Sequence, residues 1–558
     1  MVRRVLQMVF REVRGLHQAA YVLAIFTFGS QILALIRDRL LASQFGADET
    51  LDIYYAAFKI PDLLFVLFAS TLSVYVLIPF VAAKRDQESS ASAGLLLSQV
   101  FSVFLVTYSV LALVIAVVTP QLVPFFFPGL VDKTEELTLL IRILLLQPLF
   151  LGISSLFGVI TQLSHRFVLY AISPLMYNLG IILGIVLFYP MYGSAGLAYG
   201  VVVGAVAHMF IQIPFVRSSE LKFGFSRTVD AKQLSDILTI SLPRALTLSL
   251  NQITLLFLVG LASAMTVGSV AVFQFAYNLN SVPLAIVGVS YSVAAFPLLA
   301  ELFAKGDLST FRLHINSALR HIIFWSVPAI ALIVVLRAQI VRVILGSGAF
   351  NWDDTRLTAA VLAILSISLV AQAVNLLFIR ALYAGGHTRA PLIISGCGFI
   401  VSVVLAYFFY NAFLMFEEIR STFEYVFRVK GVLGTEVLMI AVAYSVSVIG
   451  QSLFLSAAIV RYYHVTLQWV KERLLKSVVA SVIGGVTAYV TLNFVVFGIN
   501  EERFLGIVLQ GGVAGLLGVI AIIWAYYVLK MPEFFEVKET LHRRVFKVST
   551  PVTTDEPL

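Results

Sequence analysis

Charged side chains interrupt a stretch of sequence that is otherwise apolar enough to lie inside a membrane. Between residues 30 and 79 they include Arg37, Asp38, Arg39, Asp52, Lys59 and Asp62. A charged side chain at the centre of a bilayer costs roughly 2.5–3.5 kcal/mol, so such residues usually face a bundle interior or a water-filled cavity. We therefore interpret this stretch as the wall of a polar chamber.

Catalytic chemistry has little support in the sequence. The chain contains no HExxH or GxxxxGK[ST] motif and no Cys/His cluster with metal-ligand spacing, and its eight histidines are dispersed. The single cysteine, Cys397, excludes an internal disulfide framework. We expect no enzymatic activity, no cofactor and no metal site. Without a P-loop, transport through the chamber would be driven by a gradient, a potential or substrate flux.

Membrane helices must position the charged residues, because 60% of the 558 residues are hydrophobic and only 12% are charged, against about 25% charged in an ordinary soluble domain. The sequence predicts an all-α, polytopic membrane protein. Runs long enough to cross a membrane as helices are expected at about fourteen places: 17–40, 54–83, 93–118, 135–163, 167–189, 194–216, 234–262, 268–303, 318–340, 357–384, 389–411, 437–461, 474–498 and 503–529.

The net charge of +8 is spread over short loops, which favours the positive-inside rule over nucleic-acid binding. With the N-terminus in the cytoplasm, that face holds 24 of the 38 lysines and arginines, and the opposite face holds ten. The other four fall inside spans: Lys59, Arg142, Arg244 and Arg380. We expect both termini in the cytoplasm.

A faint internal repeat keeps a constant offset of 222 residues. It relates three pairs: Gly46 and Gly268, Pro61 and Pro283, and His165 and His387. The repeat predicts that spans 1–6 and 7–12 form two pseudo-symmetric six-helix lobes, related by an axis along the membrane normal, with a substrate site between them.

The expected organisation follows from these spans. An amphipathic segment at 1–16 precedes an N-lobe at 17–216, a cytoplasmic linker at 217–233, a C-lobe at 234–461 with an outer insertion at 412–436, two further helices within 474–529, and a cytoplasmic tail at 530–558.

The string LIRDRLLASQFGADETLDIYYAAFKIPDLL at 35–64 resembles the signature of the MurJ (MviN) family of lipid II flippases. An RD pair ends the first span, FGA follows, then an Asp, and AFKxP opens the second span. Further strings agree in order: LPRALTLSLNQI at 242–253, AYNLNSVPLAIVGVSYSVAAFPLLAE at 276–301, ILGSGAFNWDDTRLTAA at 344–360 and LYAGGHTRAPL at 382–392. The similarity covers roughly residues 20–530.

The resemblance implies a V-shaped pair of lobes with an alternating cavity, on the scaffold of the MATE-like multidrug/oligosaccharidyl-lipid/polysaccharide exporter superfamily. The last two spans would build a groove for the polyprenyl tail. Family members move the lipid-linked peptidoglycan precursor to the outer leaflet of the bacterial inner membrane. The implied partners are a polyprenyl-linked lipid, membrane lipids and cell-envelope synthesis proteins, with no nucleic acid, and the chain is expected to be a monomer.

The expected substrate-binding residues combine the family match with the charged stretch. They are Gln31, Arg37, Asp38, Asp52, Lys59, Asp62, Arg244 and Asn278. Compared with the family pattern, this chain lacks a basic residue at Gln31, an arginine at Phe65, an acid at Ser70 and the arginine of span 8 at Asn278. The resemblance therefore implies a divergent member, in which binding of a diphosphate would depend on Arg37, aided by Lys59 and Arg244.

Each of these residues also has a structural interpretation. Arg37 and Asp38 could pair at a helix end, Lys59 could snorkel to the outer surface, and Asn278 could cap a break near Pro283. Arg142, Arg244 and Arg380 could each serve a structural ion pair or carbonyl.

Two other functions stay open at this point. The chain could be a transport-inactive scaffold of cell-envelope assembly, whose insertion 412–436 and basic tail bind partners, or a small-molecule antiporter. The two helices expected within 474–529 favour the flippase, because a soluble-substrate antiporter of twelve spans would not need them. The absence of basic residues at Gln31, Phe65 and Asn278 favours the scaffold.

The topology is directly testable by a cysteine accessibility scan. Sites in 120–134, 412–436 and 498–503 should react from outside, while 84–90 and 217–232 should react only after permeabilisation. Labelling of 217–232 from outside would overturn the assignment from positive charge.

Overall fold

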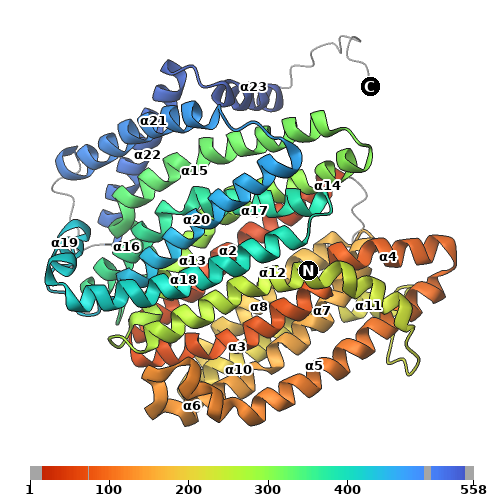
Figure 1. Ribbon diagram of the computed structural model, residues 1–558. Coiled ribbons are helices and arrows are strands. Elements are labelled where there is room, and N and C mark those ends of the chain that lie inside the picture. Colours follow the sequence, from red (N-terminus) through yellow and green to blue (C-terminus); the bar gives the residue numbers. More distant parts are fainter. Residues whose placement is uncertain (1–15, 73, 496–503, 547–558) are drawn as a thin grey trace, which may run out of the picture. The chain divides into compact units, whose positions relative to one another are not determined.

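The computed structural model describes residues 16–72, 74–495 and 504–546, and every regular element within them is a helix (Figure 1). The predicted all-α class is therefore confirmed. Residues 1–15 of the expected amphipathic segment and residues 547–558 of the tail lie outside the described residues.

The chain divides into two compact units, and the first comprises Met1–Asn278, Ile344–Ile364 and His387–Gln451. Its helices are α2 (Leu16–Phe45), α3 (Glu49–Thr71), α4 (Val74–Gln87), α5 (Ser90–Phe126), η1 (Pro128–Lys133), α6 (Thr134–Leu144), α7 (Leu146–Leu163), α8 (Phe167–Leu183), η2 (Gly184–Phe188), α9 (Tyr189–Tyr192), α10 (Ser194–Phe210), α11 (Ile213–Ser218), α12 (Ala231–Ser263), α18 (Arg389–Met415) and α19 (Glu417–Phe427).

The second unit comprises Leu279–Val343, Leu365–Gly386 and Ser452–Leu558. Its helices are η3 (Ala285–Val289), α14 (Ser290–Ala304), α15 (Leu308–Ile344), α17 (Leu369–Ala384), α21 (Val470–Val490), η4 (Thr491–Val495), α22 (Phe504–Val528) and α23 (Pro532–Phe546). Three helices begin in the first unit and end in the second: α13 (Ser269–Leu284), α16 (Trp352–Ile367) and α20 (Val437–Tyr463). The lobes expected at 17–216 and 234–461 stay a prediction.

Many helices are suited to cross a membrane. Among the described residues, eleven helical segments are long and apolar enough, and the pair α16 and α17, bent by 46° at its break, would be a twelfth. The expected count of fourteen is not reached by this measure. The first two expected spans correspond to α2 and to α3 with α4, the part of the chain that carries the charged stretch.

The single span expected at 54–83 is wrong in its bounds. Helix α3 starts earlier, at Glu49, and ends at Thr71, and α4 starts at Val74. Glu49 and Asp52 lie in the first turn of α3, where negative charge is favourable to the helix dipole. The break between the two helices follows Thr71.

Helix α15 likewise begins ten residues before the expected span at 318–340. Asp307 precedes its first turn and accepts hydrogen bonds from Ser309 Oγ at 2.6 Å and from Thr310 N at 3.0 Å. These bonds stabilise the carboxylate and lower the pKa of Asp307 to about 2. A capped start of this kind lets the helix form outside the apolar run.

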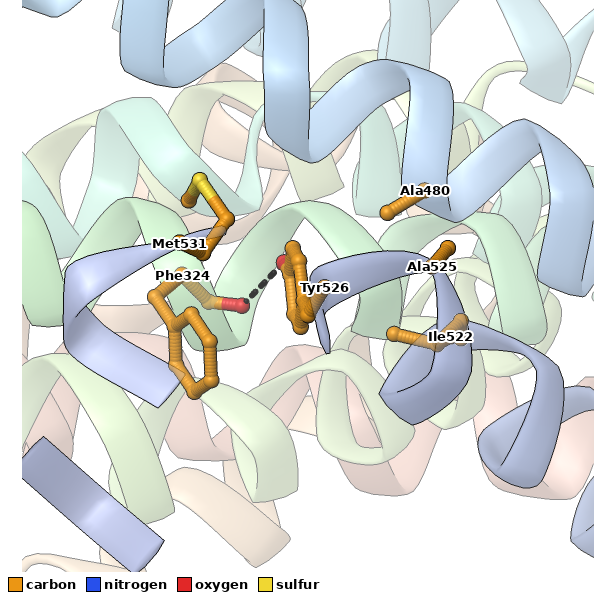
Figure 2. Close-up of a cluster of buried hydrophobic side chains, with 6 residues drawn as sticks. All are labelled: Phe324, Ala480, Ile522, Ala525, Tyr526 and Met531. Atoms are coloured by element: carbon orange, nitrogen blue, oxygen red, sulfur yellow. Dashed lines mark hydrogen bonds between the residues drawn. The ribbon is translucent and has the colours of Figure 1, made fainter. Parts of the chain in front are cut away.

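In the second unit, α21 and α22 lie side by side (Figure 1). A buried cluster joins them to α15, and Figure 2 shows its six residues: Phe324, Ala480, Ile522, Ala525, Tyr526 and Met531. The Tyr526 ring stacks on Phe324 with centroids 4.5 Å apart, and its hydroxyl donates to Phe324 O at 2.8 Å. The hydroxyl of Tyr526, which is the polar end of a side chain in this apolar cluster, thereby has a hydrogen-bond partner. Residues 532–546 of the expected tail form α23, which packs on α22.

In the first unit, glycines let α8 and α10 approach closely. Gly180 faces Gly204, and a Cβ built on either would collide with the backbone of the opposite helix. Gly184 and Gly200 face each other in the same way, one turn along. Small residues at such spacing are how membrane helices bring backbones into contact. The contact holds α8 in place, and α8 supplies side chains to the site described below.

The glycine contact predicts a specific loss of stability. Gly200→Leu would force α8 and α10 apart, and overpacking of this kind costs typically about 1–3 kcal/mol. The midpoint of thermal unfolding in detergent should therefore fall. Gly512→Leu is the matched control, because a side chain at this helical glycine meets nothing within 4 Å. Equal shifts in the two variants would contradict the glycine contact.

Candidate functional site

A cavity of about 190 Å³ lies within the first unit, among helices α2, α3, α8 and α13. It is lined by Arg37, Leu41, Tyr54, Tyr55, Phe58, Lys59, Asp62, Tyr177, Ile181, Gln274 and Asn278. Four of the eight expected site residues, Arg37, Lys59, Asp62 and Asn278, therefore share one cavity.

Arg37 is held by two partners. Its Nε and Nη2 atoms donate to Asp38 Oδ1 at 2.9 Å and 2.8 Å, and its Nη1 atom donates to Asn178 Oδ1 at 3.2 Å. Asp38 is buried and lies behind Arg37. Asn178 comes from α8, two residues before Gly180, so the close approach of α8 and α10 positions this contact. The guanidinium is oriented from both sides and still reaches the cavity.

Lys59 connects to the same carboxylate through two amides. Its Nζ atom donates to Gln274 Oε1 at 2.6 Å, and Gln274 Nε2 donates to Asn278 Oδ1 at 2.7 Å. Asn278 Nδ2 then donates to Asp38 Oδ2 at 3.1 Å. One continuous chain of hydrogen bonds therefore links both cations of the cavity through Asp38. Such chains polarise each member, so that each bond strengthens the next.

Asp62 follows Lys59 by one helical turn and lies within its electrostatic field. It accepts a hydrogen bond from the side chain of Gln147 on α7. Tyr54 and Tyr177 lie close enough to Asp62 to feel its charge. Hydroxyl and amide groups thus surround the charges, as a chamber for a polar group requires.

Asp52 has a different place from the one expected. Its two carboxylate oxygens accept from Gly268 N at 2.6 Å and from Ala271 N at 2.8 Å, and the side chain is buried. Asp52 therefore caps the N-terminus of α13, where the backbone donors lack helical partners. Gly268 has a φ of +90°, and a Cβ there would collide with Ala47 O. Asp52 fastens α3 to α13 and does not line the cavity.

Two more expected residues do not line the cavity. Gln31 lies on α2 and Arg244 on α12, and neither belongs to its wall. Sequence reasoning missed Tyr54, Tyr55, Tyr177, Asn178 and Gln274. Gln274 could have been found from its position one helical turn before Asn278, and Asn178 from its polar side chain inside an apolar run.

The side chains that line the cavity are suited to binding an anion rather than to catalysis. Arg37 and Lys59 present charged donors to the cavity, and charge-assisted hydrogen bonds of this kind are the strong ones. Among the described residues, no group of three His, Cys, Asp or Glu side chains could hold a metal ion. The site is suited to holding a charged solute.

Comparison with solved structures identifies the fold. The fold is similar to a multidrug resistance MATE family transporter of the MOP superfamily in an inward-facing conformation, with a TM-score of 0.62 and 16% identity over 77% of this chain and 95% of that one. It is also similar to a lipid II flippase MurJ in an inward closed conformation, with a TM-score of 0.70 and 23% identity over 91% and 99% of the two chains. The chain therefore shares its fold with these two proteins.

Sequence comparison gives the family. The model of the family "Lipid II flippase MurJ" matches residues 41–502, and this chain belongs to that family. The probable lipid II flippase MurJ of Rhizobium tropici is 27% identical over 66% of this chain and 70% of its own length. That of Thermotoga maritima is 26% identical over 68% and 78%. The expected family assignment is confirmed.

The cap made by Asp52 can be tested by stability. Asp52→Ala removes two hydrogen bonds to a charged acceptor, and such bonds contribute about 1.5–3 kcal/mol, so thermal unfolding should occur at lower temperature. Asp48→Ala is the matched control, because Asp48 precedes α3 and its side chain makes no cap hydrogen bond. If both variants unfold at the same temperature, Asp52 does not act as a cap.

Proposed function

We propose that this protein flips lipid II, a polyprenyl-diphosphate-linked glycan used in peptidoglycan synthesis, from the inner to the outer leaflet of the bacterial inner membrane by alternating access. One observation carries the proposal: Arg37 of the family motif lies, together with Lys59, in the wall of a cavity among helices that otherwise present apolar side chains. The membership of the chain in the MurJ family supports the same substrate. The protein acts as a transporter and needs no catalytic residue.

The chemistry of the substrate explains the cavity. A diphosphate sugar cannot cross hydrocarbon, since burying a charge without partners is costly, whereas an isoprenoid chain is soluble in it. Arg37 offers a planar fork suited to phosphate, and Lys59 offers a compact ammonium. Gln274 and Asn278 can turn their amides as an anion enters, because an amide both donates and accepts.

The volume of the cavity sets which part of the substrate it holds. At about 190 Å³ it falls below the roughly 300–1,000 Å³ of pockets that bury a drug-sized ligand. We assign it to the diphosphate, with the glycan outside and the polyprenyl chain along α21 and α22. Asp62 adds a negative charge that opposes the diphosphate, so this chain grips it less firmly than a cavity lined by cations alone would.

Alternating access requires the outer ends of the helices to open. In the first unit, backbone contacts join the helix ends on the side that positive charge assigns as outer. Ala349 N donates to Ser43 O at 2.8 Å, and a Cβ on Gly46 would lie 2.9 Å from Ala349 O. The cap of Asp52 on α13 belongs to the same closure. We propose that these contacts break when the cavity opens to the side that positive charge assigns as outer.

The topology, the oligomeric state and the partners of the protein are also part of the proposal. Both termini lie in the cytoplasm, the chain acts as a monomer, and envelope-synthesis proteins use its product. The family match does not favour the scaffold or the small-molecule antiporter.

Binding of a polyprenyl diphosphate by Arg37 variants tests the proposed site. A charge-assisted contact contributes roughly 1.5–3 kcal/mol, so Arg37→Ala should weaken binding about ten- to a hundredfold. Arg37→Lys should recover only part, since an ammonium lacks the bidentate fork. Asn278→Arg should bind more tightly, because it adds a cation to the cavity. The measurement is native mass spectrometry of the purified variants with the lipid at matched folded yield.

Arg39→Ala serves as the control, since Arg39 is two residues away on α2 but does not line the cavity. Unchanged affinity in Arg37→Ala would remove this arginine from the site and turn the interpretation towards a scaffold.

A further inference from the structure

The insertion between α18 and α20 contains one helix, α19, and a turn that leads the chain back to α20. After α18 ends at Met415, the single residue Phe416 leads into α19, which ends with Arg428 in the left-handed conformation at a φ of 60°. The chain then returns through two glycines with positive φ, Gly431 and Gly434, to α20. In Figure 1, α19 stands at the end of α18.

Hydrogen bonds hold this insertion against the rest of the first unit. Arg356 of α16 donates to the Arg428 carbonyl at 2.7 Å and 3.0 Å. Glu436 accepts from Thr266 N at 3.0 Å and from Thr266 Oγ1 at 2.6 Å. Thr266 lies two residues before Gly268, whose N–H is bonded to Asp52. The insertion is therefore a fixed part of the closed outer end rather than a loose loop.

Helix α19 carries an apolar stripe that the described protein buries only in part. At 100° per residue, one side of the helix holds Ile419, Phe423, Val426 and Phe427, and Phe416 continues the stripe. Val426 is 59% exposed and Phe416 is 57% exposed. By contrast, Val429 and Val432 after the helix are buried. Phe423 and Phe427 are half-buried, and Phe416, Ile419 and Val426 form the edge of the stripe that stays exposed.

The position of α19 along the chain indicates what covers the stripe. Helix α18 is one of the apolar candidate spans, and its exposed apolar surface continues through Leu414 and Met415 into Phe416. With 11 residues, α19 is about 16 Å long and starts one residue past the end of the span. An amphipathic helix so close to a span lies at the boundary between headgroups and acyl chains.

The charges of the helix agree with a lipid surface. Glu417 and Glu418 lie in the first turn, where the helix dipole favours them, and Arg420 pairs with Glu424 at 2.9 Å. At 100° per residue, these groups lie on other sides of the helix than Ile419 and Val426, and Arg420 borders the half-buried Phe427. The polar side has no cluster of basic residues, so the attraction is hydrophobic and does not depend on anionic lipid.

We infer that α19 is an interfacial foot that inserts its apolar stripe into the leaflet next to the closed outer end of the helices. The partner is the lipid surface itself, on the face that positive charge assigns as outer. Through Glu436 and Thr266 the foot touches the loop that Asp52 caps. The foot therefore holds this end of the protein at a fixed depth where the cavity would open.

Spin labels on single cysteines test the foot in nanodiscs of a zwitterionic lipid that hold one copy of the full chain. Cys397 is first replaced by serine, because it is exposed. Labels at Ile419→Cys and Val426→Cys should collide more with membrane-dissolved oxygen than with a water-soluble nickel complex. The label at Ser421→Cys, on the opposite side of the helix, should show the inverse ratio.

Two results would overturn the inference. Preferential access of the nickel complex at all three positions would place α19 in water. Low access of both reagents at Ile419 and Val426 would mean that protein covers the stripe. Val426 is 59% exposed, so cysteine at this position leaves the packing of the protein nearly unchanged.

Discussion

The cost of placing charge among apolar helices governs the arrangement of the first unit. Asp38 is buried, and it is tolerated because Arg37 and Asn278 donate to its two oxygens. Removing one partner of such a buried pair leaves an uncompensated charge, which costs far more than the pair itself gains. Helices α2 and α13 must therefore lie where these bonds can form. The hydrogen bonds of the cavity are a condition of the fold as well as its functional surface.

Close packing of helix backbones determines which side chains reach this pair. Asn178 and Tyr177 arrive from α8, whose Gly180 is pressed against Gly204 of α10. In a membrane, where lipid is as apolar as leucine, such contact between small residues supplies much of the association between helices. The geometry of the Arg37 site is thus set partly by residues that never touch a solute.

The ends of the helices follow a related rule. The first N–H groups of a helix lack partners, and for α13 Asp52 supplies them from a helix far away in sequence. The contact is reversible in principle, because those donors could bond to water when the helices separate. The same loop is bound by Glu436 of the insertion, so the cap of Asp52 and the insertion share one short segment. Under the proposed mechanism, opening of the cavity and attachment of α19 to the membrane surface would be physically connected there.

The sequence by itself determined the membrane class, the helical content and the family, because apolar runs and the ordered motifs are local properties of the chain. It also predicted a polar chamber, since charge inside an apolar run must find such a place, and four of the eight residues proposed for it, Arg37, Lys59, Asp62 and Asn278, line one cavity. It did not predict the bounds of α3 and α4, where capping and a break outweighed the hydrophobic run.

Only the tertiary structure decided the role of each charged residue. Asp52 has the same side chain as Asp62 and lies on the same helix, yet one caps a backbone and the other lines a cavity. Gln274 and Asn178 join the site because other helices carry them to Lys59 and Arg37. Hydrogen bonds between residues more than a hundred positions apart depend on how helices pack, and no local pattern in the sequence encodes that packing.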